Sequence, residues 1–262
     1  MPIKGHGATG LLPRLGTKML MLAIDTATRS GSVALLDKGH IVGARYFDTN
    51  LEHSRRLFVE IDELLERSAQ QAAALDGVAV SVGPGSYTGL RIGLSAAKGL
   101  CLASGAALVT VPTLDAIAAG LPYCSDAVCA LVGARSGETC WALYDTTDGD
   151  PRSLSAPRID SVPEVLDRLP GAPVVLCGEG AVAFVDLVQD FPHYRCAPEP
   201  IGKPQACYVG YLGHAKLMAG DTEDLDSAEP EYLRTPNYET ALEQRARKAS
   251  TAVGSKTHHA RR

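Results

Sequence analysis

Hydrophobic positions in the first quarter of the chain form short runs separated by polar turns. Residues 19–25 predict a buried strand that ends on a carboxylate, and residues 32–36 and 41–46 predict two more strands. A turn at residues 37–40 is short enough to join the last two as a hairpin. The pattern therefore predicts a meander of three strands.

The hydrophobic period then changes to that of a helix. Thr49 and Glu52 form a capping box for a helix that runs to about residue 68. Its large apolar residues exceed what one helix needs to cover its own sheet; they are Leu57, Phe58, Ile61, Leu64 and Leu65. We expect part of this surface to meet something other than that sheet.

A glycine-rich turn follows the next apolar run. Residues 78–82 predict a strand, and a helix of small residues is expected to run from the turn to about residue 104. Gly83, Gly85 and Gly89 allow a sharp turn and a concavity of backbone N–H groups. Thr88 stands where G-x-G-x-x-G needs glycine, and no Gly-Lys-Ser/Thr triplet exists. The turn alone favours a structural role over phosphate binding and leaves both open.

The second half repeats this order of elements. A strand at 107–111 and a short helix from 113 complete the first half, and strands are predicted again at 127–133, 138–145 and 153–159. A capping box of Ser161 and Glu164, a strand at 173–177, a helix to about 188 and a helix over 205–218 follow. Both halves also contain Arg-Ser-Gly before an apolar strand that ends in Asp.

A duplication explains the repeated order best. Two βββαβα halves facing each other predict an α/β protein with the actin-like (ASKHA, ribonuclease H-like) architecture. The expected division is a first lobe over 19–120 and a second over 121–236. Residues 1–18 are expected to be a disordered leader, and 237–262 a disordered basic tail.

Composition narrows the class of protein. The chain has 262 residues, of which 45% are hydrophobic and 21% charged, with a net charge of −5. This balance is ordinary for a globular protein and lacks the basic surplus of a general nucleic-acid binder. No apolar run is long enough for a membrane span, and no signal peptide is evident, so we expect a cytoplasmic protein without membrane contact. Seven cysteines without a C-x-x-C pair indicate reduced thiols.

Several segments together resemble the TsaB (YeaZ) family of the actin-like superfamily. The resemblance covers roughly residues 19–236 and is strongest in the first half. It is carried by residues 22–28 with 31–35, 52–57, 83–93, 134–138 with Trp141-Ala142, and the closing 231–234. The most specific segment is Gly83-Pro-Gly-Ser-Tyr-Thr-Gly-Leu-Arg91.

The resemblance implies a role in making N6-threonylcarbamoyladenosine at position 37 of tRNAs that read ANN codons. It implies a non-catalytic scaffold that forms a heterodimer with TsaD, the catalytic paralogue, in an assembly with the ATPase TsaE. The tRNA would be met through the complex, and a homodimer is a further expectation. No cofactor of its own is implied, because ATP or ADP would enter the assembled complex through the partners.

The resemblance also implies which residues matter. The expected partner interface lies on the two helices of the first half and comprises His53, Leu57, Phe58, Ile61, Leu64, Leu65, Gly89, Arg91, Gly93 and Ala97. Candidate nucleotide contacts within the complex are Gly83, Gly85, Ser86 and Thr88. No catalytic residue and no metal ligand is expected. TsaD holds its metal with H-x-x-x-H, whereas His53 is followed four residues later by Leu57.

Two other functions stay open. An actin-like ATPase or kinase would use Asp25 at the end of the first strand to orient magnesium, although we favour Asp25 as a turn cap. A peptidase of the kind once called glycoprotease would need Ser86 or Thr88 as nucleophile, and no base stands beside either in sequence. We consider the peptidase the least favoured of the three.

Overall fold

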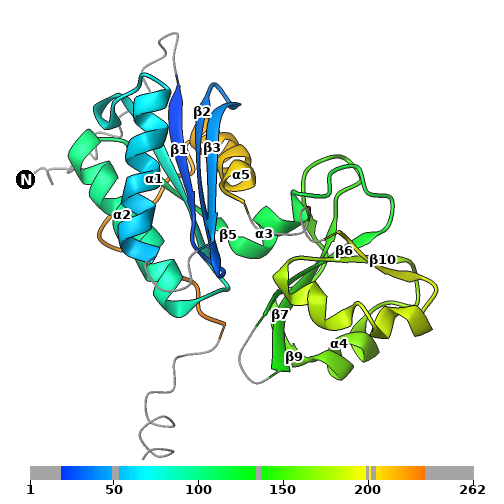
Figure 1. The fold of residues 1–262 in the computed structure, drawn as a ribbon. Coiled ribbons are helices and arrows are strands. Elements are labelled where there is room, and N and C mark those ends of the chain that lie inside the picture. Colours follow the sequence, from blue (N-terminus) through cyan, green and yellow to red (C-terminus); the bar gives the residue numbers. More distant parts are fainter. Residues whose placement is uncertain (1–18, 49–52, 134–136, 199–200, 202–204, 234–262) are drawn as a thin grey trace, which may run out of the picture.

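The computed structural model describes residues 19–48, 53–133, 137–198, 201 and 205–233, arranged in two lobes (Figure 1). Several features expected from the sequence lie outside the described residues. They are the leader over 1–18, the Thr49–Glu52 capping box, the Arg-Ser-Gly copy at 135–136 and the tail over 237–262.

The first lobe is built on a five-stranded sheet with the order β3-β2-β1-β4-β5. Its strands are β1 (Leu20–Asp25), β2 (Ser30–Asp37), β3 (His40–Asp48), β4 (Gly77–Gly83) and β5 (Ala107–Pro112). The first three are antiparallel, whereas β4 and β5 run parallel to β1. The sheet is buried on both faces, which explains why β1 and β4 are apolar at nearly every position.

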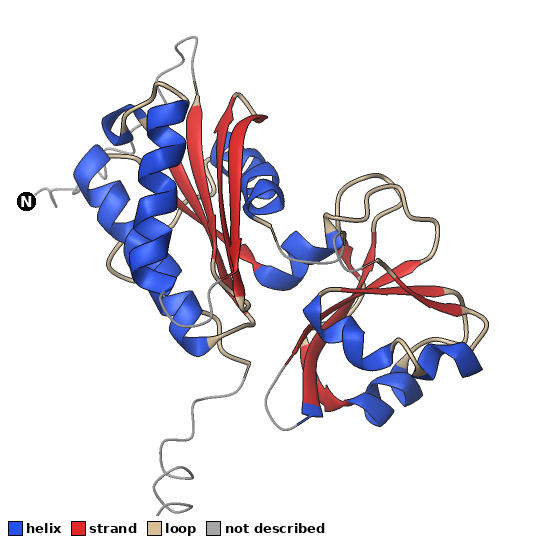
Figure 2. Cartoon of the chain, viewed as in Figure 1, coloured by secondary structure: helices blue, strands red, loops and turns tan. Residues whose placement is uncertain are grey.

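Helices cover both faces of this sheet. On one face α1 (His53–Arg67) and α2 (Tyr87–Ser104) lie side by side, and α5 (Ala206–Ala219) covers the other (Figures 1 and 2). Side chains alternate along β1, so that Leu20, Leu22 and Ile24 face α1 and α2. Met21 and Ala23 face α5. A short 3₁₀ helix, η1 (Ala72–Ala74), precedes β4.

The second lobe repeats the strand order of the first. Its sheet runs β11-β10-β6-β7-β8, and β9 also pairs with β7. The strands are β6 (Ala127–Gly133), β7 (Glu138–Asp145), β8 (Arg152–Ser153), β9 (Arg158–Ser161), β10 (Val174–Cys177) and β11 (Tyr194–Cys196). Counted in chain order, both sheets read 3-2-1-4-5, with the third strand of the second lobe broken into β8 and β9. The predicted duplicated, actin-like α/β fold is confirmed.

Two helices pass between the lobes. After β5, α3 (Thr113–Ala118) packs through Leu114 and Ile117 against β6 and β7 of the second lobe. After β11, α5 returns and packs against the first sheet. Residues 206–233, which the sequence assigns to the second lobe, therefore lie on the first lobe, and this exchange ties the lobes together.

The second lobe departs furthest from the prediction. The expected helix to residue 188 is two 3₁₀ helices, η3 (Glu179–Phe184) and η4 (Leu187–Asp190), and β11 was not predicted at all. The expected strand at 153–159 is interrupted between β8 and β9. The helix α4 (Val162–Arg168) begins at the predicted box, because the Ser161 N–H donates to the Glu164 carboxylate at 2.9 Å.

Among the described residues, no helix combines the length and apolar character that a membrane crossing requires. All seven cysteines are free thiols, four of them buried.

Candidate partner-binding face and glycine turn

The glycine turn brings the first turn of α2 against the chain that leaves β1. A Cβ at Gly85 would lie 2.4 Å from the carbonyl oxygen of Ala27, and one at Gly89 only 2.1 Å from that of Thr26. Neither distance is possible for a real side chain. These glycines are therefore required by internal packing between the β1–β2 turn and α2.

Backbone N–H groups of the turn already have partners inside the chain. Gly83 N–H donates to the Thr113 hydroxyl at 3.1 Å, and Ser86 N–H donates to the Ala27 carbonyl at 2.6 Å. The Ser86 hydroxyl accepts from Gly89 N–H at 3.2 Å and so caps the helix. A phosphate cradle needs such groups to point at the ligand, so the geometry favours the structural role for Gly83, Gly85 and Ser86. Thr88 is exposed on the first turn of α2. Nucleotide contact by any of the four stays a prediction.

Asp25 is fully buried at the end of β1 and acts as a turn cap. Its Oδ1 accepts the Ser81 hydroxyl at 2.6 Å and the Ala27 N–H at 3.2 Å, while Oδ2 has no hydrogen-bond partner among the described residues. Burial raises the pKa of this carboxyl above its ordinary value, and the hydrogen bonds from Ser81 and Ala27 lower it in part. These contacts place Asp25 in the packing of the turn, as favoured from the sequence.

The inward face of α1 consists of residues predicted for the interface. Leu57, Ile61, Leu64 and Leu65 are at most 6% exposed, because they pack on β1, β2 and β4 together with residues of α2. The expectation that these four exceed what the sheet needs is wrong, since the helix uses all of them to cover it. His53 begins α1, but its side chain lies outside what the structure describes.

The outward face of α1 carries different side chains. Phe58 is 52% exposed and Val59 41% exposed, so two large apolar residues face away from the core. Of the five residues counted as surplus, Phe58 is the one that is free of the sheet. Exposure singles out Val59, which the sequence did not.

The outward face of α2 forms a narrow stripe at helical spacing. The exposed positions are Thr88, Arg91, Ser95, Gly99 and Leu102, with Ala103 also exposed beside Leu102. Leu102 is 81% exposed, and the small Ser95 and Gly99 between the ends of the stripe allow a neighbouring helix to approach closely. Gly93 and Ala97, which were also predicted for the interface, are buried against the protein's own sheet. A Cβ at Gly93 would lie 2.3 Å from the Thr26 hydroxyl.

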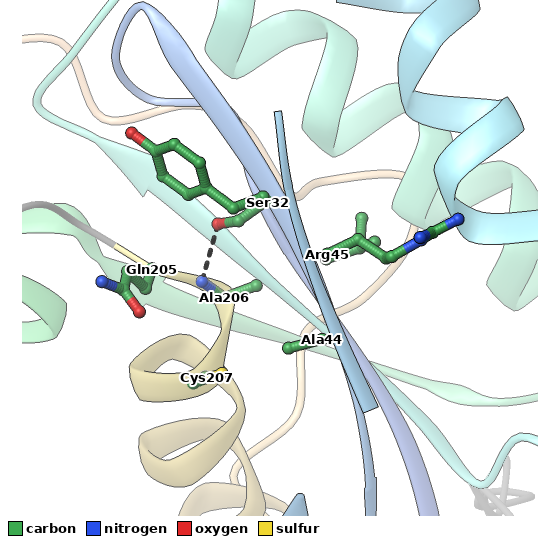
Figure 3. A pocket seen from close by; sticks show the side chains of 8 residues that line it. Ser32, Ala44, Arg45, Gln205, Ala206 and Cys207 are labelled. Atoms are coloured by element: carbon green, nitrogen blue, oxygen red, sulfur yellow. Dashed lines mark hydrogen bonds between the residues drawn. The ribbon is translucent and has the colours of Figure 1, made fainter. Parts of the chain in front are cut away.

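A small pocket of about 100 Å³ lies where α5 begins beside β2 and β3 (Figure 3). Its lining is Ser32, Val33, Ala44, Arg45, Tyr46, Gln205, Ala206 and Cys207. The Ser32 hydroxyl already accepts the Ala206 N–H at 2.8 Å, so this N–H of the helix start is occupied. Arg45 extends towards α1 (Figure 3), where its Nε lies 3.1 Å from a Glu60 carboxylate oxygen. The pocket therefore offers little to an anion.

The described part of the chain shows no metal-binding cluster, and the Ser86 hydroxyl is engaged by the backbone. There, no group of three or more His, Cys, Asp or Glu residues is placed to hold a metal ion. Ser86 is a helix cap, and its hydroxyl accepts a backbone N–H. This arrangement gives no support to Ser86 as a nucleophile.

The structure adds contacts that no sequence pattern indicated. Tyr232, from the end of the described chain, lies beside the first turn of α2, where its hydroxyl accepts a hydrogen bond from Arg91 Nε at 3.2 Å. Tyr144 of β7 donates to an Asp115 carboxylate oxygen on α3 at 2.7 Å. Both pairs join residues that are far apart in sequence, so spacing alone gives no signal for them.

Comparison with known proteins identifies the family. The family model for TsaD, tRNA N6-adenosine threonylcarbamoyltransferase, matches residues 48–194. The chain is 32% identical over 231 residues to the tRNA threonylcarbamoyladenosine biosynthesis protein TsaB of Escherichia coli, covering 82% of this chain and 95% of that protein. It is 26% identical over 230 residues to TsaB of Bacillus subtilis, covering 84% and 96%.

A solved structure agrees with the sequence relatives. YeaZ from Pseudomonas aeruginosa superposes with a TM-score of 0.68 at 26% identity, covering 82% of this chain and all of that one. The chain therefore belongs to the TsaB (YeaZ) family, the tRNA threonylcarbamoyladenosine biosynthesis proteins related to TsaD.

Proposed function

We propose that this chain is a non-catalytic scaffold in the synthesis of N6-threonylcarbamoyladenosine at position 37 of tRNAs reading ANN codons. In this role it binds TsaD through the outward faces of α1 and α2 and activates it for threonylcarbamoyl transfer. TsaE joins the assembly, the tRNA is met through the complex, and ATP or ADP is held by the partners. We place this threonylcarbamoyl transfer in the cytoplasm.

The observation that carries this proposal is the pair of adjacent outward helix faces. Phe58 and Leu102 are large apolar side chains exposed to solvent on two helices that lie side by side. Ser95 and Gly99 leave room for a partner helix between the ends of α2. Exposed apolar and small residues on paired helices suit a four-helix interface with an equivalent pair. The outward face of α1 also exposes charged residues, which are Arg55, Arg56, Asp62, Glu66 and Arg67. When TsaD is absent, two copies of this chain would pair with each other through the same face.

The residues expected to contact the partner change accordingly. Phe58 and Arg91 remain from the predicted interface, His53 stays a prediction because its side chain lies outside the described residues, and the exposed Val59, Ser95, Gly99 and Leu102 join them. The other predicted residues lie on the buried side of the two helices. They are Leu57, Ile61, Leu64, Leu65, Gly89, Gly93 and Ala97. Their role is to hold the helices in place for the exposed residues.

The test is the affinity for purified TsaD, measured by calorimetry with a double variant, Phe58→Asp with Leu102→Asp. Two charges in place of the large exposed apolar side chains of this contact are expected to weaken binding by at least about thirtyfold, as changes at hot-spot residues do. Both residues are exposed, so the thermal midpoint should move little. The matched control is Leu154→Asp with Val182→Asp, two exposed residues of the second lobe. Equal affinity for TsaD in both double variants and the wild type would refute the proposed face.

A further inference from the structure

The described chain ends in a strap, residues 225–233, that returns to the first lobe and crosses the glycine turn. Its near end is anchored in the core, since Ala228 is buried there and Leu225 packs against the same cluster. The Asp224 carboxylate accepts N–H groups of Asp226 and Ser227, each at 3.0 Å, and so fixes the turn that starts the strap. The strap therefore has a defined path.

The strap touches the turn through the backbone of Glu231. Glu231 N–H donates to the Val82 carbonyl at 2.7 Å. Gly83 has φ +130°, and a Cβ at this position would lie 2.3 Å from the Glu231 carbonyl oxygen. Gly83 is thus required by the strap itself, whereas Gly85 and Gly89 are required by the β1–β2 turn.

The next residue, Tyr232, contacts the first turn of α2. Its ring lies 5.0 Å from the Tyr87 ring, and its hydroxyl accepts from Arg91 Nε at 3.2 Å. The Arg91 guanidinium lies over the Tyr87 ring, 4.2 Å from its centre. Because a guanidinium is planar, a bond at Nε and a stacked face together fix the direction of the whole group.

Arg91 lies in the exposed stripe of α2, one turn after Thr88 at its N-terminal end. The charged residues of this helix are Arg91 and Lys98, and it contains no Asp or Glu. An arginine held in one direction loses less rotamer freedom on binding, and its planar fork matches a carboxylate. The face therefore suits a protein partner that presents an acidic side chain opposite Arg91.

We propose that the strap is a positioning element for the partner-binding face: Tyr232 orients Arg91 to meet a carboxylate of the partner. This inference rests on the proposed function, because the partner is the protein that binds α1 and α2. It assigns a role to the closing segment, residues 231–234, which is part of the family resemblance but to which that resemblance gives no role. Tyr232 acts through Arg91 and does not itself contact the partner.

A double-mutant cycle tests the strap, using calorimetry of the full chain with TsaD at two salt concentrations. Tyr232→Phe keeps the ring beside Tyr87 and removes only the hydroxyl, so folding should be unaffected. We expect it to weaken binding about threefold to tenfold, and Arg91→Ala by at least tenfold, in line with a charge-assisted contact. In the Arg91→Ala background, Tyr232→Phe should have no further effect, and both single variants should reduce the salt dependence of the dissociation constant.

Tyr211→Phe is the matched control, because Tyr211 is an exposed tyrosine whose hydroxyl also bonds a side chain, donating to Asp150 at 2.5 Å. It should bind TsaD like the wild type. Wild-type affinity in Tyr232→Phe, or an equal loss with and without Arg91, would overturn the strap proposal while leaving the scaffold intact. Failure of the wild-type chain to bind TsaD would instead refute the proposed function.

Discussion

The two lobes share a strand order but differ in the segment that comes after the fourth strand. After β4, Gly85 and Gly89 approach the chain that leaves β1. After β10, a Cβ at Gly178 would lie 2.1 Å from the carbonyl oxygen of Leu131, in β6. Both turns therefore use glycine for a close approach, to the residues that follow β1 in the first lobe and to β6 itself in the second.

The segments that leave these turns are different. The first lobe continues into α2, an 18-residue helix beside the 15-residue α1, whereas the second continues into η3 and η4 and has only the 7-residue α4. The glycine turn thus belongs to the duplicated fold, and the paired long helices belong to the first lobe alone. This difference supports the proposal that partner binding uses the helices rather than the loop.

The largest expected effect is the loss of stability when a side chain is placed at the glycine turn of either lobe. Gly89→Val and Gly178→Val each place a Cβ 2.1 Å from a backbone oxygen, and each should lower the free energy of unfolding by about 3 kcal/mol or more. Urea denaturation followed by circular dichroism measures the loss. The control is Gly99→Ala, where nothing lies within 4 Å and a gain of about 0.5–1 kcal/mol is expected. Wild-type stability in Gly89→Val would contradict the packing role of this turn.

A smaller effect separates the two faces of α1. Ile61→Ala removes a buried side chain from the core of the first lobe and should cost about 2–4 kcal/mol. Phe58→Ala removes an exposed ring and should change the stability of the free chain by about 0.5 kcal/mol or less. The same urea experiment compares them. If Phe58→Ala destabilised the free chain as much as Ile61→Ala, the outward face would be part of the core.

The smallest effect concerns Asp25, the carboxyl group at the end of β1. The second lobe has no titrating group at the same place, because β6 ends at Gly133. Because burial raises the pKa of Asp25, the protonated form stabilises the fold, and this contribution is lost as pH rises through the raised pKa. Asp25→Asn keeps an acceptor for Ser81 and Ala27 without the charge. Relative to the wild type, its thermal midpoint should therefore improve from about pH 4 towards pH 8. A constant difference across this range would show that Asp25 does not titrate there.

Much of the first lobe was predictable because its elements are long and strongly patterned. β1, β4 and α2 have apolar runs or periods that match a single structure, and α1 has a clear inward face. The second lobe was less predictable because η3 and β11 are short and their hydrogen bonds depend on tertiary packing. The path of α5 onto the first sheet was also hidden, since a sequence does not say which lobe an apolar helix covers.

The proposed interface could be assigned to helices but not to their faces. The family resemblance implied an interface on α1 and α2, and the residues chosen for it were apolar or small without a distinction between inward and outward positions. The burial of Ile61 and Leu65 became clear only from their packing on the sheet. The exposure of Leu102 became clear only from the side of α2 on which it lies. The contact between Tyr232 and Arg91 could not be predicted, because the two residues are 141 positions apart in the sequence.

The most direct test of the central claim is threonylcarbamoyl transfer to an ANN-decoding tRNA in a reaction reconstituted from TsaD, TsaE and this chain. The account predicts transfer with the wild-type chain or the Leu154→Asp, Val182→Asp control. It predicts a loss of about thirtyfold or more without the chain or with Phe58→Asp, Leu102→Asp. Full transfer in the absence of the chain, or with the Phe58, Leu102 variant, would contradict a scaffold that acts through the outward faces of α1 and α2.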